Sequence, residues 1–205
     1  MYFLRLMFLI LFSVNLFAFN GGPIPDKAMK KAERKYGGLV VSRFIEYNNL
    51  LENSKHFALH QKLKTVNDFF NKIPFKSDIK NWKREDYWAT PLEFLARYKG
   101  DSEDYVIAKY FALKTMGVDT SKLYFTYVNS KKFKRPHMVL SYFKTPESDP
   151  FILDNINPEL LNASERNDLT PIYNFNPSAQ VQDESQATTH KNWEKLYKRV
   201  QRNKL

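Results

Sequence analysis

Three residues in the second half of the chain have the types and the order of a nucleophile, a general base and an orienting acid. Ser102 opens an apolar run that predicts a helix, while His137 and Asp154 lie on two predicted strands further along the chain. In such a set, His137 takes a proton from the nucleophile and later returns it, while Asp154 orients the ring. The chemistry would be acyl transfer through a covalent intermediate. Taken singly, His137 also fits a packed histidine, and Asp154 fits a turn former.

The side chain at position 102 is unexpected for its predicted place. A helix N-terminus offers free backbone N–H groups and the positive end of the helix dipole, which together stabilise a thiolate. The chain has Ser102 at this point and contains no cysteine, and a hydroxyl is far harder to ionise than a thiol. The backbone N–H of Ser102 is a candidate oxyanion donor, and we expect Trp88 or its neighbours to supply a second donor or to wall the cleft.

Three carboxylates adjoin position 102 in the sequence: Asp101, Glu103 and Asp104. Uncompensated, they would oppose an anion at position 102 by like charge. A hard divalent cation takes oxygen ligands of this kind and would neutralise them. The sequence therefore predicts a calcium site at Asp101 and Glu103, with Asp104 as a further candidate ligand. The alternative is that these acids only cap the helix and complement its dipole.

Hydrophobic periodicity and breaker residues predict an α+β fold, in which helices come first and pack on an antiparallel sheet formed afterwards. Asp26 is expected to cap a basic helix that ends at Gly37. Thr90 is expected to cap a helix that starts at Pro91 and stops at Gly100. The stretch 76–86 is predicted to be irregular and 180–189 to be a mobile linker, while 162–168 is polar. Further helices are predicted at 39–51, 57–73, 102–116 and near the end of the chain, and strands at 122–128, 137–143, 151–154 and 169–175.

Composition restricts the compartment and the partners of this chain of 205 residues. Residues 1–18 combine one basic residue with an apolar run, which predicts a signal peptide; a membrane anchor is the alternative. Residues 19–205 are predicted to form one exported domain without a stable membrane span. The absence of cysteine excludes disulfides, thiolate metal sites and a lipoprotein. The formal net charge of +10 is spread over the first and last helices, which favours solvated faces over a nucleic-acid site. An acidic protein substrate or lipid headgroups are the alternative partners.

Several separated motifs between positions 80 and 175 resemble the bacterial transglutaminase-like cysteine proteinases of the LapG type. They lie at 86–95, 100–105, 109–111, 136–140, 153–155 and 168–171. The resemblance implies a papain/transglutaminase-like fold, a nucleophile at position 102 with His137 and Asp154, and calcium near Asp101 and Glu103. It also implies a periplasmic protease that clips the N-terminal part of a large surface adhesin, and an inner-membrane receptor for cyclic di-GMP as its inhibitor.

The departure from this family is Ser102, since the family pattern has cysteine at that position. Either a catalytic cysteine was removed deliberately, or the substitution is natural and gives a pseudoenzyme or a serine enzyme. We expect little or no turnover from the chain as written, with retained binding of substrate or receptor. The alternative functions are a non-catalytic pseudoprotease binding module and an enzyme that acts on cell-wall peptides.

Overall fold

The computed structural model describes residues 21–132, 134–179 and 186–202 of the chain. The predicted signal peptide at 1–18 lies outside the described residues. The described elements are, in chain order, α1 (Asp26–Tyr36), α2 (Leu39–Ser54), α3 (Leu59–Phe70), α4 (Asp78–Trp82), α5 (Pro91–Arg97), α6 (Ser102–Thr115), η1 (Thr120–Lys122), β1 (Leu123–Ser130), β2 (Arg135–Tyr142), β3 (Phe151–Leu153), β4 (Leu161–Asn162), η2 (Ala163–Glu165), β5 (Leu169–Phe175) and α7 (Ala187–Gln201).

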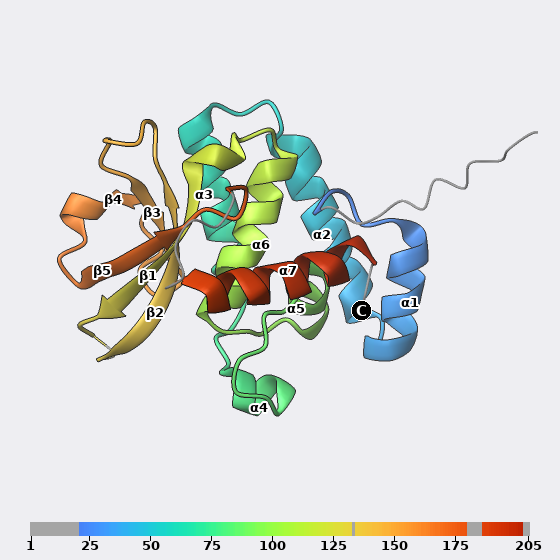
Figure 1. Cartoon of the computed structure of the whole chain (residues 1–205). Helices are drawn as coiled ribbons and strands as arrows, with labels where there is room; N and C mark the ends of the chain where they lie inside the picture. Colours follow the sequence, from blue (N-terminus) through green and yellow to red (C-terminus); the bar gives the residue numbers. More distant parts are fainter. Residues whose placement is uncertain (1–20, 133, 180–185, 203–205) are drawn as a thin grey trace, which may run out of the picture.

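The described strands form one antiparallel sheet in the order β4-β3-β2-β1-β5, and the helices cover one of its faces (Figure 1). Side chains alternate between the two faces of a strand. On β1, Leu123 and Phe125 therefore join the main core beneath the helices, whereas Val128 packs with a smaller cluster on the opposite face. This arrangement confirms the predicted order of helices first and antiparallel sheet second.

Helix α6 is the central helix of the fold, and its residues 104–113 are all buried. It packs against α3, α5 and β2, so it has core contacts on several sides. A helix that is enclosed in this way is apolar on all sides. This explains why the apolar residues of α6 do not repeat along a single face. The packing fixes the first turn of α6, where Ser102 stands, relative to the sheet.

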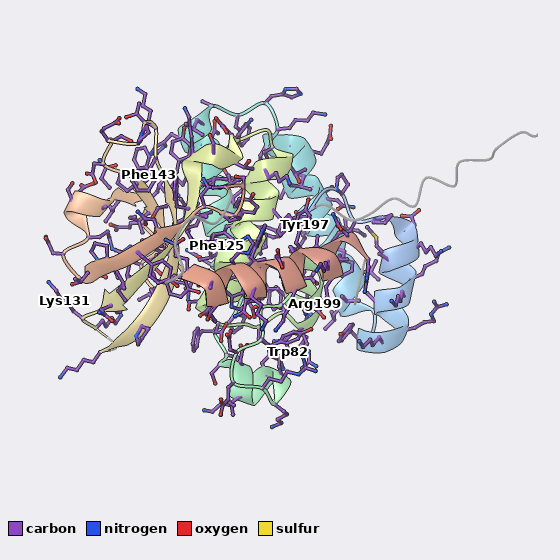
Figure 2. All side chains as sticks on the ribbon, viewed as in Figure 1. Trp82, Phe125, Lys131, Phe143, Tyr197 and Arg199 are labelled. Carbon is purple, nitrogen blue, oxygen red and sulfur yellow. The ribbon has the colours of Figure 1, made fainter. Side chains whose placement is uncertain are left out.

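Helix α7 lies across the helical layer and buries Trp193, Leu196 and Val200 (Figures 1 and 2). Trp193 stacks on Phe111 of α6, with ring centroids 5.7 Å apart. The polar face of α7 carries the basic residues seen in the sequence. Of the helices in the described ranges, none is long and apolar enough to cross a membrane.

Several local predictions were wrong in detail. The N-cap of α1 is Pro25 and Asp26 is the first helical residue, so Asp26 does not cap the helix. Helix α5 ends at Arg97, and its C-cap residue Tyr98, with a φ of 54°, provides the left-handed stop that was predicted at Gly100. Helix α4 lies in a stretch predicted to be irregular, strand β4 was not predicted, and residues 187–189 of the predicted linker belong to α7. Thr90 is the N-cap and Pro91 the first helical residue, as predicted, and Glu93 completes a capping box.

Candidate functional site

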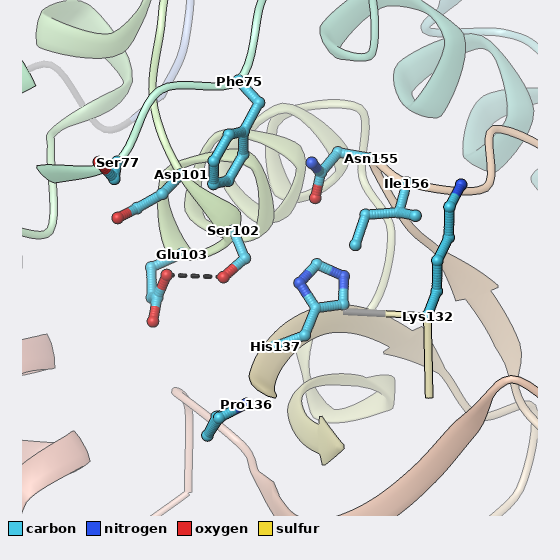
Figure 3. Close-up of a pocket in the computed structure, with 10 residues that line it drawn as sticks. All are labelled: Phe75, Ser77, Asp101, Ser102, Glu103, Lys132, Pro136, His137, Asn155 and Ile156. Atoms are coloured by element: carbon cyan, nitrogen blue, oxygen red, sulfur yellow. Dashed lines mark hydrogen bonds between the residues drawn. The ribbon is translucent and has the colours of Figure 1, made fainter. Parts of the chain in front are cut away.

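Ser102, His137 and Asp154 come from three elements that meet at one end of the sheet. Ser102 is the first residue of α6, His137 lies near the start of β2, and Asp154 directly follows β3. Because β2 and β3 are antiparallel, the start of one strand lies beside the end of the other. Ser102 and His137 line a cavity of about 420 Å³, across which the imidazole faces the Ser102 side chain (Figure 3). The predicted place of residue 102, at a helix N-terminus packed on the sheet, is confirmed.

His137 and Asp154 form a buried pair, with Nε2 of the ring 2.8 Å from Oδ1 of the carboxylate. Oδ2 of Asp154 accepts a hydrogen bond of 2.7 Å from the Arg166 guanidinium, and Oδ1 also accepts from the backbone N–H of Ile156. Burial alone would raise the pKa of Asp154, but the hydrogen bonds from His137 and Arg166 hold it well below its usual range. Asp154 is therefore a carboxylate at neutral pH, and Nδ1 of His137 remains for position 102.

The hydroxyl of Ser102 is directed to Glu103 rather than to His137. Ser102 Oγ donates to Glu103 Oε2 over 2.8 Å, and no hydrogen bond to His137 is found in the part of the chain that the structure describes (Figure 3). A carboxylate attracts a neutral hydroxyl but opposes its ionisation. The structure thus brings the three predicted residues to one cavity without joining Ser102 to the base.

Three buried or half-buried carboxylates lie together beside the first turn of α6. Asp78, Asp101 and Asp104 each offer one oxygen, and these oxygens lie within 4.8 Å of one another. Asp78 Oδ1, Asp101 Oδ1 and Asp104 Oδ2 are buried and have no hydrogen-bond partner within the described residues. Calcium holds oxygen ligands at about 2.3–2.6 Å, so ligands of one ion can lie about 5 Å apart. We call Asp78, Asp101 and Asp104 the acidic cluster; its geometry and unpartnered oxygens fit a calcium ion.

Without a cation the protonated forms of these carboxyl groups are favoured, so that Asp101 and Asp104 are protonated at neutral pH whereas Asp78 loses its proton near pH 6. Burial, reinforced by the neighbouring carboxylates, raises the pKa of Asp101 to about 10 and that of Asp78 to about 6. Burial also raises the pKa of Asp104 well above its usual range. A divalent cation reverses this effect because it stabilises the ionised forms. Asp101 is the N-cap residue of α6, yet its side chain makes no capping hydrogen bond, so capping alone does not account for the cluster.

The segment between α4 and α5 provides backbone donors to this cluster. The N–H of Tyr87 donates to Asp78 Oδ2, and the N–H of Ala89 donates to Asp104 Oδ1 over 2.7 Å. Gly100 makes the close approach of Asp104 possible, because a Cβ at this position would lie 2.4 Å from Asp104 Oδ2. Backbone and side chains together therefore fix the two innermost carboxylates.

The predicted metal ligands are only partly brought together. Asp101 and Asp104 belong to the acidic cluster, whereas Glu103 lies outside that group and contacts Ser102; a metal role for Glu103 stays a prediction. Trp88 is buried in the core against Phe125 and does not line the cavity, so the role predicted for it as a wall of the cleft was wrong.

Sequence reasoning missed two residues of the site. Asp78 lies in a polar stretch that lacks periodicity, so nothing marked it as buried. Arg166 bridges Asp154 and Asp168, and its side chain is 1% exposed. Asp168 belongs to the motif at 168–171. The position of Arg166, two residues before this aspartate, was the signal that could have identified it.

Comparisons with known proteins agree with this arrangement. The family model of the bacterial transglutaminase-like cysteine proteinases (BTLCP) matches residues 48–199. The chain belongs to this family. Its structure is similar to that of Legionella pneumophila LapG, with 36% identity, a TM-score of 0.74, and coverage of 88% of this chain and 99% of that chain. A search of curated proteins found no match.

Two further solved states of the Legionella protein are also similar to this transglutaminase-like proteinase. The EGTA-treated form has 36% identity and a TM-score of 0.73, covering 87% of this chain and 100% of that chain. The calcium-bound form has 35% identity and a TM-score of 0.72, covering 86% of this chain and 99% of that chain. These similarities confirm the papain/transglutaminase-like α+β fold class.

Proposed function

We propose that this chain is a LapG-type, calcium-dependent cysteine endopeptidase of the periplasm whose turnover is suppressed by Ser102. Its substrate is the N-terminal region of a large surface adhesin, and cleavage there would release the adhesin and disperse a biofilm. An inner-membrane receptor for cyclic di-GMP is the proposed inhibitor. The observation that carries the proposal is the buried His137–Asp154 pair facing the start of α6 beside the acidic cluster. Membership of the proteinase family supports it.

The chain's own residues supply an acyl-transfer mechanism once a thiol stands at position 102. Nδ1 of His137 takes the proton from sulfur, and the sulfur attacks the scissile carbonyl carbon. The protonated imidazole then gives its proton to the leaving amine, and Asp154 stabilises the ring while it is charged. Water, activated by the same imidazole, hydrolyses the thioester and regenerates the thiol.

The acidic cluster would hold the calcium ion through Asp78, Asp101 and Asp104. When bound, the ion supplies positive charge beside the first turn of α6. Asp101 and Asp104 lie within two residues of position 102, and the ion would allow them to ionise as ligands while its positive charge offsets theirs, so that they would not oppose an anion there. Their side chains also fix the turn that carries the nucleophile.

The hydrogen bond from Ser102 to Glu103 favours a second candidate function, a pseudoprotease binding module. In that function the cavity would bind the adhesin segment, or the chain would bind the receptor, without bond cleavage. The serine hydroxyl lacks the acidity of a thiol, and it is not hydrogen-bonded to the base in the described structure. The endopeptidase and the binding module both predict that the Ser102 form retains binding. They differ in whether Ser102→Cys produces cleavage.

A cleavage assay on an adhesin N-terminal fragment tests the proposal. We expect the Ser102 form and a Ser102→Ala control to leave the fragment intact, while Ser102→Cys cleaves it with calcium and fails with EGTA. Adding His137→Ala to Ser102→Cys should abolish cleavage by removing the base. Binding of the fragment by every form with no cleavage by Ser102→Cys would favour the binding module. If Ser102→Cys cleaved cell-wall peptides but not the adhesin fragment, the substrate would be a cell-wall peptide.

A further inference from the structure

Arg199 of α7, labelled in Figure 2, contacts both the segment that precedes α5 and the first turn of α5. Its guanidinium donates to the hydroxyl of Tyr87, to the backbone carbonyl of Trp88 and, over 3.3 Å, to Glu93 Oε2. The guanidinium carbon also lies 4.5 Å from the centre of the Tyr87 ring. The side chain is 21% exposed, so this fork of contacts is shielded from most of the solvent.

The same segment contacts the acidic cluster with its other backbone groups. The N–H groups of Tyr87 and Ala89 donate to Asp78 and Asp104, while the carbonyl of the intervening Trp88 accepts from Arg199. The two N–H groups and the carbonyl point in opposite directions. The acidic cluster therefore holds this segment on one side, and Arg199 holds it on the other. If Arg199 is removed, Tyr87 and Trp88 lose these contacts with α7, and the exposed hydrogen bond from Asn192 of α7 to Asp86 remains beside the segment.

The contacts of Arg199 with Tyr87, Trp88 and Glu93 are called the clamp. Glu93 connects this clamp to the start of α5. Its Oε1 accepts from the Tyr87 hydroxyl over 2.8 Å, and its Oε2 accepts from the N–H of Thr90 over 2.8 Å. Arg199 is the cation that pairs with Glu93 among the described ion pairs. The charge pair, the aromatic ring and the backbone carbonyl therefore act on a segment of four residues, 87–90.

We propose that Arg199 is a positioning residue for the divalent-cation site: it holds the segment 87–90 against the acidic cluster and so sets the cluster's affinity for calcium. The inference rests on the proposed calcium site and adds a residue far outside it in sequence. Groups that orient metal ligands commonly change metal affinity about 10–100-fold when removed. We expect a change of about tenfold or more because two of the three carboxylates accept from this segment.

The test is calcium titration by calorimetry of chelator-treated protein, comparing the parent with Arg199→Ala, Arg199→Lys and Lys198→Ala. Arg199→Ala should raise the Kd for calcium about tenfold or more. Arg199→Lys should recover little, because an ammonium group lacks the planar fork that reaches a carbonyl and a carboxylate together. Lys198→Ala is the matched control, since Lys198 is an exposed neighbour on α7 and should leave the Kd unchanged.

Two further readouts separate positioning from general stabilisation. A merely structural role would lower Tm equally with calcium and with EGTA, whereas positioning reduces the rise in Tm that calcium produces. Arg199→Ala should also speed hydrogen exchange at the amides of Tyr87 and Ala89 in calcium-free protein. An unchanged Kd or unchanged exchange would overturn the role of Arg199. Absence of calcium binding by the parent itself would refute the proposed metal site, and the exchange rates would still decide whether the clamp exists.

Discussion

The carboxylate of Asp154 lies between His137 and Arg166, with His137 Nε2 2.8 Å from its Oδ1. This relationship keeps the acid ionised and determines which ring nitrogen faces position 102. It also makes Arg166 a support for the candidate catalytic pair, although Arg166 does not line the cavity with Ser102.

Replacing Arg166 with methionine should destabilise the protein strongly. Removing one partner of a buried ion pair costs about 3–5 kcal/mol, because the remaining charge is left uncompensated. Asp154 is 1% exposed, so its carboxylate would carry this cost. Urea unfolding at neutral pH measures the loss, and Arg34→Met on the exposed side of α1 is the control, expected to change stability by less than about 0.5 kcal/mol. Equal stability of the two variants would contradict the role assigned to Arg166.

Asp78→Asn and Glu103→Gln distinguish the acidic cluster from the ligands expected from sequence. Asp78→Asn should weaken calcium binding at least tenfold, because it removes a charged oxygen ligand from the cluster. Glu103→Gln should bind calcium like the parent, since Glu103 lies outside the cluster and contacts Ser102. Calcium titration by calorimetry compares the two. A large loss in Glu103→Gln with none in Asp78→Asn would favour the ligand set predicted from sequence.

Gly100→Ala should disturb the acidic cluster by displacing the carboxylate of Asp104. A Cβ there would lie 2.4 Å from Asp104 Oδ2 and 2.7 Å from Phe94 Cε2, so neighbouring groups must move. Overpacking of this kind costs about 1–3 kcal/mol, and we expect weaker calcium binding as well. Gly38→Ala is the matched control: its backbone is helical at φ −61°, and nothing lies within 4 Å of the added atom. Thermal unfolding with and without calcium should show a loss in Gly100→Ala alone.

Lys109 should make stability depend on pH in the neutral to alkaline range. Burial lowers its pKa to about 7 from an ordinary value of 10.5, although Asp154 and Asp68 act in the opposite direction. Between these values the unfolded chain binds more protons than the folded one, so the free energy of unfolding from this group rises with pH. Lys109→Met removes the titrating group. The stability of the parent minus that of the variant should therefore increase from about pH 7 to pH 10 in urea titrations, and a flat difference would contradict this.

The arrangement of elements follows from features that the sequence displays locally. The capping box at Thr90, the apolar run after Ser102 and the alternating strands depend on near neighbours, and all of them appear in the structure. Tertiary contacts decide the rest. Asp78 and Arg166 lie in polar stretches, and their burial arises only when distant segments pack against them. Glu103 and Asp104 are adjacent in sequence, but the helix directs their side chains differently. Glu103 contacts Ser102, and Asp104 belongs to the acidic cluster.

The clamp from α7 has a consequence for the order in which the protein is made. A chain emerges during synthesis with its N-terminal part first, and helix α6 with its acidic first turn precedes α7 by many residues. The segment 87–90 lacks its contacts with Arg199 until that last described helix has been translated and has docked. If Arg199 sets the geometry of the acidic cluster as proposed, the candidate metal site would reach its final form only after α7 docks, when the sheet that carries His137 and Asp154 is already available. A nascent chain would thus carry the parts of the site before it carries their final geometry.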